Sequence, residues 1–109
     1  MSTADQLDDF LVQVVDVTPL VGSGGMGDVY GDVVLGVPCL VDETARLVRD
    51  RTGAEVVSTA SVFARTSAPD APPGSLLVLP SGRTAVVLTQ ARRTSGLLDL
   101  PDHVEWAVE

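Results

Sequence analysis

Between two valine-rich segments the chain reads Leu20-Val21-Gly22-Ser23-Gly24-Gly25-Met26-Gly27-Asp28-Val29-Tyr30-Gly31, which holds five of the ten glycines in the 109 residues. Glycine lets the backbone adopt positive φ angles and lets another group approach closely. The flanking segments are apolar and β-branched, which predicts strands on both sides. The stretch has three interpretations: a phosphate-binding loop, a dinucleotide fingerprint, or a long loop that joins two strands.

The phosphate-binding interpretation rests on glycine spacing. Gly22, Gly24 and Gly27 fit the pattern G-x-G-x-x-G, and the run from Gly24 to Tyr30 is similar to the glycine-rich loop of bacterial Ser/Thr kinases. A kinase also needs a lysine on a following strand. This chain has no lysine, since all seven of its basic residues are arginine, and it contains neither a His-Arg-Asp nor an Asp-Phe-Gly motif.

The dinucleotide interpretation needs a helix that begins at the glycines, because the helix N-terminus binds the pyrophosphate. Pro38 and the β-branched residues around it oppose a helix over 32–41. We therefore favour the third interpretation, a long flexible loop between two strands. Loops of this length are usually functional or disordered, and we expect this one to be a contact or gating element that binds no phosphate.

Length and composition indicate one domain with a modest core. The formal net charge is −8, which argues against a free-standing nucleic-acid binder, because such proteins carry a basic face. No run approaches the ~20 apolar residues of a membrane span. The N-terminus is polar and acidic, unlike a signal peptide. The single cysteine, Cys39, lies in an apolar run and is expected in the core of an intracellular protein.

The first half of the chain has strand patterns. Phe10 to Val17 carries apolar side chains on both faces, so we expect both faces to be covered. Val33 to Val41 contains Gly36 and Pro38, which predicts a bulge or an edge position.

A hairpin is predicted next. Residues 45–49 alternate polar and apolar, the turn at 50–53 ends on Gly53 at a position that favours positive φ, and residues 54–64 return as a long strand. A helix over 42–51 is the main rival interpretation, because its residues tolerate one.

The second half begins with another long loop. Arg65 to Gly74 contains three prolines and is expected to lack regular structure. Residues 76–79 and 84–91 form a hairpin through the turn at 80–83. The end of the chain, 103–109, alternates so that every second residue is apolar, which predicts a half-buried strand.

These elements predict an all-β protein, a small antiparallel barrel or sandwich of about six or seven strands with two long loops. Residues 1–9 are expected to form a flexible N-terminal arm, and residues 10–109 the single barrel domain.

Catalytic chemistry is not expected. His103 is the only histidine, and it lies on the polar side of the final strand with no nucleophile motif to serve. The acidic pairs at 8–9 and 42–43 lack the spacing of metal ligands. Arg92 and Arg93 are interpreted as a charged loop edge, and Trp106 as a core residue. We predict no enzyme activity, no cofactor and no metal.

The order of several short motifs suggests a family. They are Gly-x-Gly-x-x-Gly-Asp-Val-Tyr-Gly at 22–31, Cys39 to Asp42 with 46–49, Gly53 to Phe63, Pro72-Pro73-Gly74-Ser75, Leu79-Pro80-x-Gly82-Arg83, and Pro101-Asp102-His103-Val104-Glu105. Over about residues 10–109 the chain resembles the head-to-tail connector proteins, the stopper or head-completion class, of long-tailed actinobacterial phages and prophages. Leu40 stands where that family usually has an aromatic residue.

The resemblance implies a non-enzymatic virion protein at the neck, made in the cytoplasm of the bacterial host. Its copies would form a ring, with six preferred and twelve as the alternative, between the portal adaptor and the tail terminator or tail tube. The ring would retain packaged DNA and let it pass without specific binding. No membrane is involved.

The two loops are the expected interface and gating elements. Their residues are Gly22, Gly24, Gly25, Met26, Gly27, Tyr30, Arg65, Pro69, Asp70, Pro72 and Pro73. The alternative from another class is a small β-barrel protein-interaction module with no role in a phage.

Overall fold

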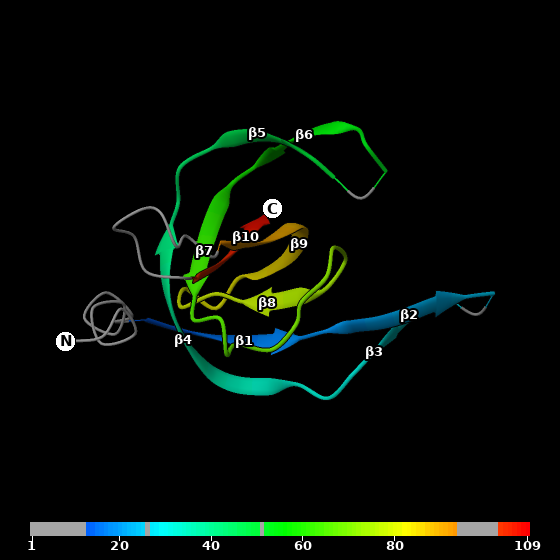
Figure 1. The fold of residues 1–109 in the computed structure, drawn as a ribbon, viewed down its shortest axis with the longest axis horizontal. Coiled ribbons are helices and arrows are strands. Elements are labelled where there is room, and N and C mark those ends of the chain that lie inside the picture. Colours follow the sequence, from blue (N-terminus) through cyan, green and yellow to red (C-terminus); the bar gives the residue numbers. More distant parts are fainter. Residues whose placement is uncertain (1–12, 26, 51, 94–102) are drawn as a thin grey trace.

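The computed structural model describes residues 13–25, 27–50, 52–93 and 103–109. Their strands are β1 (Gln13–Thr18), β2 (Leu20–Gly24), β3 (Gly27–Tyr30), β4 (Val34–Asp42), β5 (Arg46–Arg49), β6 (Glu55–Ser58), β7 (Ala60–Ala64), β8 (Leu76–Val78), β9 (Thr84–Arg93) and β10 (His103–Val108). Six of them close a barrel in the order β1-β4-β7-β10-β9-β8, with every neighbouring pair antiparallel and β8 paired back to β1 (Figure 1). The part of the chain described here holds no helix that could cross a membrane.

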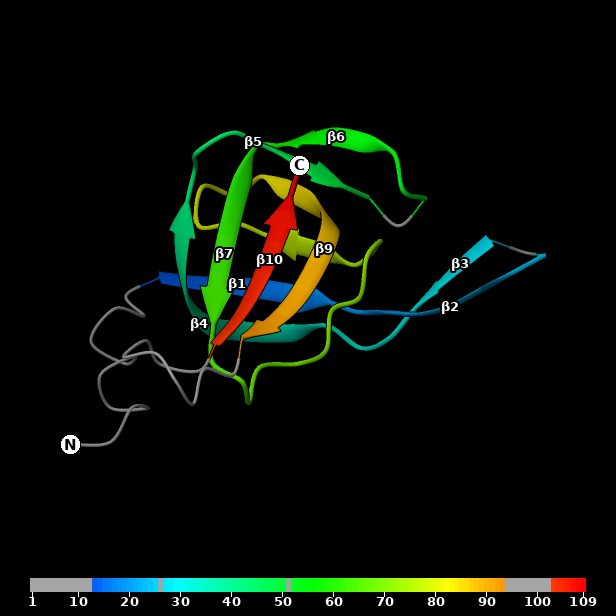
Figure 2. The ribbon, with the colours of Figure 1, turned by 45° about the horizontal axis from the view of Figure 1, so that its top comes forward.

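Two hairpins continue the barrel pairings beyond the barrel. The β1–β4 pairing places Val17 opposite Val34, and the same two chain segments pair again as β2–β3, where Gly22 lies opposite Val29. The β4–β7 pairing likewise continues as β5–β6, in which Leu47 lies opposite Val57. We call the β2–β3 hairpin, residues 20–30, the arm. Figures 1 and 2 show the arm projecting from one side of the barrel, and the turn end of β5–β6 extends toward the same side.

A bulge in β4 bends the long strand at the base of the arm. Val15 faces Val37, but Val17 faces Val34, so β4 has one residue more than β1 over this interval. Gly36 takes the left-handed conformation there, with φ of 66°, and its N–H donates to Asp16 Oδ1 at 3.0 Å. A glycine in this conformation is what a bulge of this kind requires.

The barrel core is built from small side chains around one large one. Trp106 is fully buried, and its neighbours are chiefly valine, alanine and leucine. The other core residues are Val15, Val17, Val37, Cys39, Ala60, Val62, Ala64, Ala71, Leu77, Leu79, Ala85, Val87, Val104 and Val108. β10 carries Val104, Trp106 and Val108 inward, as the alternation of the final segment predicts, and Ala107 on its other face is buried as well.

The predicted fold class is confirmed, and so are the turns: Gly53 and Gly82 both have positive φ. Four details were wrong. The stretch 22–31 is a paired hairpin and not an irregular loop. The predicted strand 54–64 breaks at Thr59 into β6 and β7, and β9 extends through Arg93, which was assigned to a loop. Val14 is exposed, so β1 is covered on one face only.

The rival helix over 42–51 is also wrong, because β5 occupies that segment. The expected flexible arm at 1–9 and the predicted start of the first strand at Phe10 lie outside the described residues.

Two buried serines give a test of this packing. The Ser58 hydroxyl lies 2.8 Å from the carbonyl oxygen of Ala60 and 3.0 Å from that of Val108, whereas Ser61 Oγ is buried with no hydrogen-bond partner among the described residues. Ser58→Ala should therefore cost about 1–2 kcal/mol in the free energy of unfolding, since it removes a buried hydrogen bond. Ser61→Ala should be neutral or stabilising by up to about 1 kcal/mol, because it removes an unpaired hydroxyl.

Urea unfolding of both variants checks this pair of expectations. Equal losses in the two variants would contradict the described environment of Ser61.

Candidate functional site

The described residues contain no group of three or more His, Cys, Asp and Glu side chains that could hold a metal. Burial raises the pKa of the Cys39 thiol to about 11, so this thiol is not a ready nucleophile near neutral pH. The His103 ring lies beside the Phe63 ring, with centroids 5.8 Å apart and planes tilted by 57°. The exposed apolar surfaces of the described chain are the candidate contact sites.

The arm is the most exposed part of the described chain. Every residue of β3, and every residue of β2 after Leu20, is exposed. Val21 and Val29 are 63% and 54% exposed, and Tyr30 is exposed as well. An isolated two-stranded hairpin is at best marginally stable in water. An apolar arm of this kind is expected to be covered by a partner.

The register of the arm gathers its glycines on one face. Gly22 lies opposite Val29, and Gly24 lies opposite Gly27, so these four residues share a side of the ribbon. A Cβ added at Gly22, Gly24 or Gly27 would meet no atom of the chain within 4 Å. Only Gly27, with φ of 103°, needs glycine for its backbone conformation. We call Gly22, Gly24, Gly27 and Val29 the glycine face.

The base of the arm is fixed to the barrel. The Leu20 N–H donates to Ser75 Oγ at 2.8 Å, and Ser75 is fully buried. The Gly31 N–H donates to the Pro19 carbonyl at 2.8 Å. A Cβ at Gly31 would lie 3.0 Å from Val21 Cγ1, so the chain at Gly31 packs closely against the Val21 side chain. The arm therefore leaves the barrel in a defined direction.

The second predicted loop, 65–74, is irregular as expected, but it is pinned to the barrel. Gln90 Oε1 accepts from the Ala71 N–H at 2.7 Å and from Trp106 Nε1 at 2.9 Å. Gln90 Nε2 donates to Asp70 Oδ1 at 2.7 Å, and Arg92 reaches the same carboxylate at 3.5 Å. The loop is thus part of the rigid wall and not a free flap.

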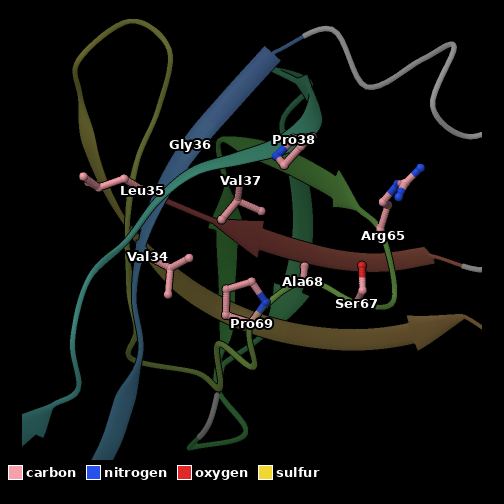
Figure 3. Close-up of a pocket in the computed structure, with 9 residues that line it drawn as sticks. All are labelled: Val34, Leu35, Gly36, Val37, Pro38, Arg65, Ser67, Ala68 and Pro69. Atoms are coloured by element: carbon pink, nitrogen blue, oxygen red, sulfur yellow. The ribbon is translucent and has the colours of Figure 1, made fainter.

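A shallow groove of about 200 Å³ separates this loop from β4. Val34, Val37, Ala68 and Pro69 supply most of its apolar lining, while Leu35 points away from the hollow (Figure 3). Arg65 and Ser67 are its polar members. A groove with one charged side chain and no carboxylate or histidine has the chemistry of a contact surface.

The β5–β6 hairpin presents a second apolar surface. Leu47 and Val57 are 71% and 52% exposed and lie directly opposite each other on its outer face. Arg49 and Glu55 form the next cross-strand pair on the same face, with Arg49 NH2 3.6 Å from Glu55 Oε1. An exposed Leu–Val pair of this kind gains free energy when a partner removes it from water.

Hydrogen bonds hold the turn of this hairpin. Asp50 Oδ1 accepts from Thr52 Oγ1 at 2.6 Å, from the Thr52 N–H at 2.9 Å and from the Ala54 N–H at 3.1 Å. The bonds from the Thr52 side chain and then from its backbone lower the pKa of Asp50. A lowered pKa means that this contribution to the turn is present at neutral pH and is lost as the pH falls through the lowered value.

Charge is divided unevenly along the chain. Residues 1–45 contain eight of the fifteen acidic residues and none of the arginines, so they carry the whole formal charge of −8. Residues 46–109 contain seven acidic residues and seven arginines and are neutral. The arm and its base are thus acidic, with Asp28 and Asp32, while β5–β6 begins and ends its first strand on Arg46 and Arg49.

The predicted contact residues fall into two separate groups. Gly22, Gly24, Gly25, Gly27 and Tyr30 lie on the arm, and Met26 lies outside the described residues. The others belong to the pinned loop and groove rim, far along the chain from the arm. These are Arg65, Pro69, Asp70, Pro72 and Pro73.

Sequence reasoning missed the Leu47–Val57 pair. The alternation of 45–49 was recognised, but either face of that strand could have been the buried one. Only the cross-strand register shows that Leu47 and Val57 share the outer face.

Comparison of the chain with protein-family models, with curated proteins and with solved structures finds no match.

Gln90 offers a test of the pinned loop. Gln90→Leu removes the acceptor of the buried Trp106 N–H and of the Ala71 N–H, and should lower the free energy of unfolding by about 2–3 kcal/mol. The control Asp70→Asn alters an exposed ion pair and should change stability by less than about 0.5 kcal/mol. Chemical denaturation measures both, and a Gln90→Leu protein as stable as the control would contradict the network.

Proposed function

We propose that this protein is a structural subunit of a phage head-to-tail connector, of the stopper or head-completion class. Its copies form a ring between the portal adaptor and the tail terminator or tail tube. The observation that carries the proposal is the apolar, glycine-faced arm anchored to a small closed barrel. Such an arm is suited to contacts between subunits, and the order of motifs along the chain resembles that family.

The charge distribution supports a role beside DNA that does not include holding it. A nucleic-acid binder neutralises phosphates with Lys and Arg, whereas residues 1–45 of this chain carry only acidic groups. A ring whose inner surface included this acidic half would repel phosphate. Packaged DNA could then be retained by a mechanical barrier and pass freely when that barrier opens.

The arm is the better gating element of the two segments. It extends beyond the barrel, whereas Gln90 and Arg92 hold the loop 65–74 against the barrel wall. In the proposed ring the loop is a rigid surface for the neighbouring proteins, and the arm makes the contacts that change during assembly. Six copies are preferred and twelve are the alternative.

The runner-up function is a protein-interaction module with no phage role. Such a module would use the same surfaces. The two functions are therefore distinguished by whether the protein occurs in phage particles. The connector proposal expects the protein in purified tailed particles, and it expects a deletion of the gene to leave DNA-filled heads and tails unjoined. Mass spectrometry of particles and electron microscopy of the deletion mutant test this. Absence from particles together with normal joining would refute the proposal.

Deletion of residues 22–27 tests the arm within this function. The barrel pairings and the core do not include these residues, so the midpoint of thermal unfolding should change by only a few degrees. Particles made with the shortened protein should fail to join tails or should lose their DNA. Global unfolding of the shortened protein would show that the arm is part of the fold and would contradict this prediction.

A further inference from the structure

The ring requires a contact between copies, and the described surfaces suggest which one. We propose that the arm of one copy lies across the outer face of the β5–β6 hairpin of the next copy, with the Leu47–Val57 pair seated against the glycine face. The existence of a ring rests on the proposed function, whereas the choice of contact does not. The contact follows from the shape, exposure and charge of the two hairpins.

Shape complementarity is the first argument. On the outer face of β5–β6, Leu47 and Val57 project side by side from paired positions. On the glycine face, three of the four positions have no side chain, which leaves the backbone open beside Val29. Glycine in a strand permits another chain to approach the backbone closely. Two projecting apolar side chains therefore meet a surface that has room for them.

The glycines themselves support a partner. Gly22 and Gly24 have no positive φ, and an added Cβ would meet no described residue within 4 Å apart from the chain neighbours, so nothing in the described part of the chain requires glycine there. Glycine in a strand also weakens the strand by loss of conformational entropy. A close contact with a second molecule accounts for residues that the isolated fold does not use.

Charge favours a second copy of this chain as the occupant. The arm and its base, residues 20–32, contain Asp28 and Asp32 and no basic residue. The β5–β6 hairpin with its turn, residues 46–58, contains three arginines against two acidic residues. The two sequence segments therefore carry opposite formal net charge, and each copy has one of each.

The geometry makes this contact head-to-tail. In one molecule the arm and the β5–β6 hairpin are separate, and both extend toward the same side of the barrel (Figures 1 and 2). Because two different surfaces meet, each copy donates its arm to one neighbour and receives an arm from another. Such a heterologous contact generates a ring when the rotation closes. Two short hairpins cover less than the ~800 Å² per partner of a standard interface, so closure and neighbouring proteins add to the stability of the ring.

Cysteine cross-linking tests the contact in the full-length protein. The double variant Val29→Cys/Leu47→Cys is treated with oxidised glutathione at high protein concentration. It should form a ladder of disulfide-linked multimers on a non-reducing gel. The control Val86→Cys/Leu47→Cys replaces an exposed valine of β9 outside both surfaces and should form at least tenfold less. The buried Cys39 remains in every variant as an internal constant.

Single-cysteine variants give the direction of the contact. A mixture of Val29→Cys with Leu47→Cys should yield disulfide-linked dimers, and neither variant alone should do so in comparable amount. Predominant Val29→Cys homodimers would indicate arm-to-arm pairing and would overturn the proposal. Equal yields in the double variant and its control would overturn it as well.

A substitution that adds a side chain to the glycine face tests the contact in a second way. Gly24→Val in the double-cysteine background places a side chain on the glycine face where the chain itself has no neighbour within 4 Å. The yield of cross-linked multimers should fall at least tenfold while the circular dichroism spectrum is unchanged. An unaffected yield would overturn the proposed face. If the protein occurs in tailed particles but these cross-links fail, the connector function stands and the assigned contact falls.

Discussion

Antiparallel pairing of β4 with two partners is the constraint on which the rest of the structure depends. One end of β4 pairs with β1 and the other with β7, so both pairings belong to the barrel wall. The core that these strands enclose consists of small residues around Trp106, and it covers only a short length of each strand. Where the paired strands extend beyond the barrel, no core residues pack against them. The arm and the β5–β6 hairpin are these extensions, and both expose large apolar side chains.

In this arrangement the residues that stabilise the barrel are different from the residues that form its exposed apolar surfaces. The buried residues and the Gln90 network stabilise the barrel. The exposed valines and glycines of the arm contribute little to the barrel core, because none of them belongs to it. A subunit that must fold alone and then assemble benefits from such a division, since its contact surfaces can be apolar without being needed for folding.

Much of the fold could be predicted from residue patterns. The alternation around Trp106, the turn glycines Gly53 and Gly82, and the bulge at Gly36 are local features with local causes. The arm could not be predicted, because its four glycines lower strand propensity and its pairing continues from β1 and β4. The sequence signal that could have indicated this hairpin is the presence of valines on both sides of a glycine-rich turn. The outward position of Leu47 and Val57 depends on register, which a single strand does not reveal.

In the single molecule the arm is fixed to the barrel only at its base, and the rest of it is exposed. Hydrogen exchange of the backbone amides measures this most directly. In dilute solution the amides of residues 27–30 should exchange through local opening, orders of magnitude faster than those of β7 and β10, which require global unfolding. Assembly at high concentration should slow the exchange of the arm. An arm as strongly protected in the dilute monomer as the barrel strands would contradict the account.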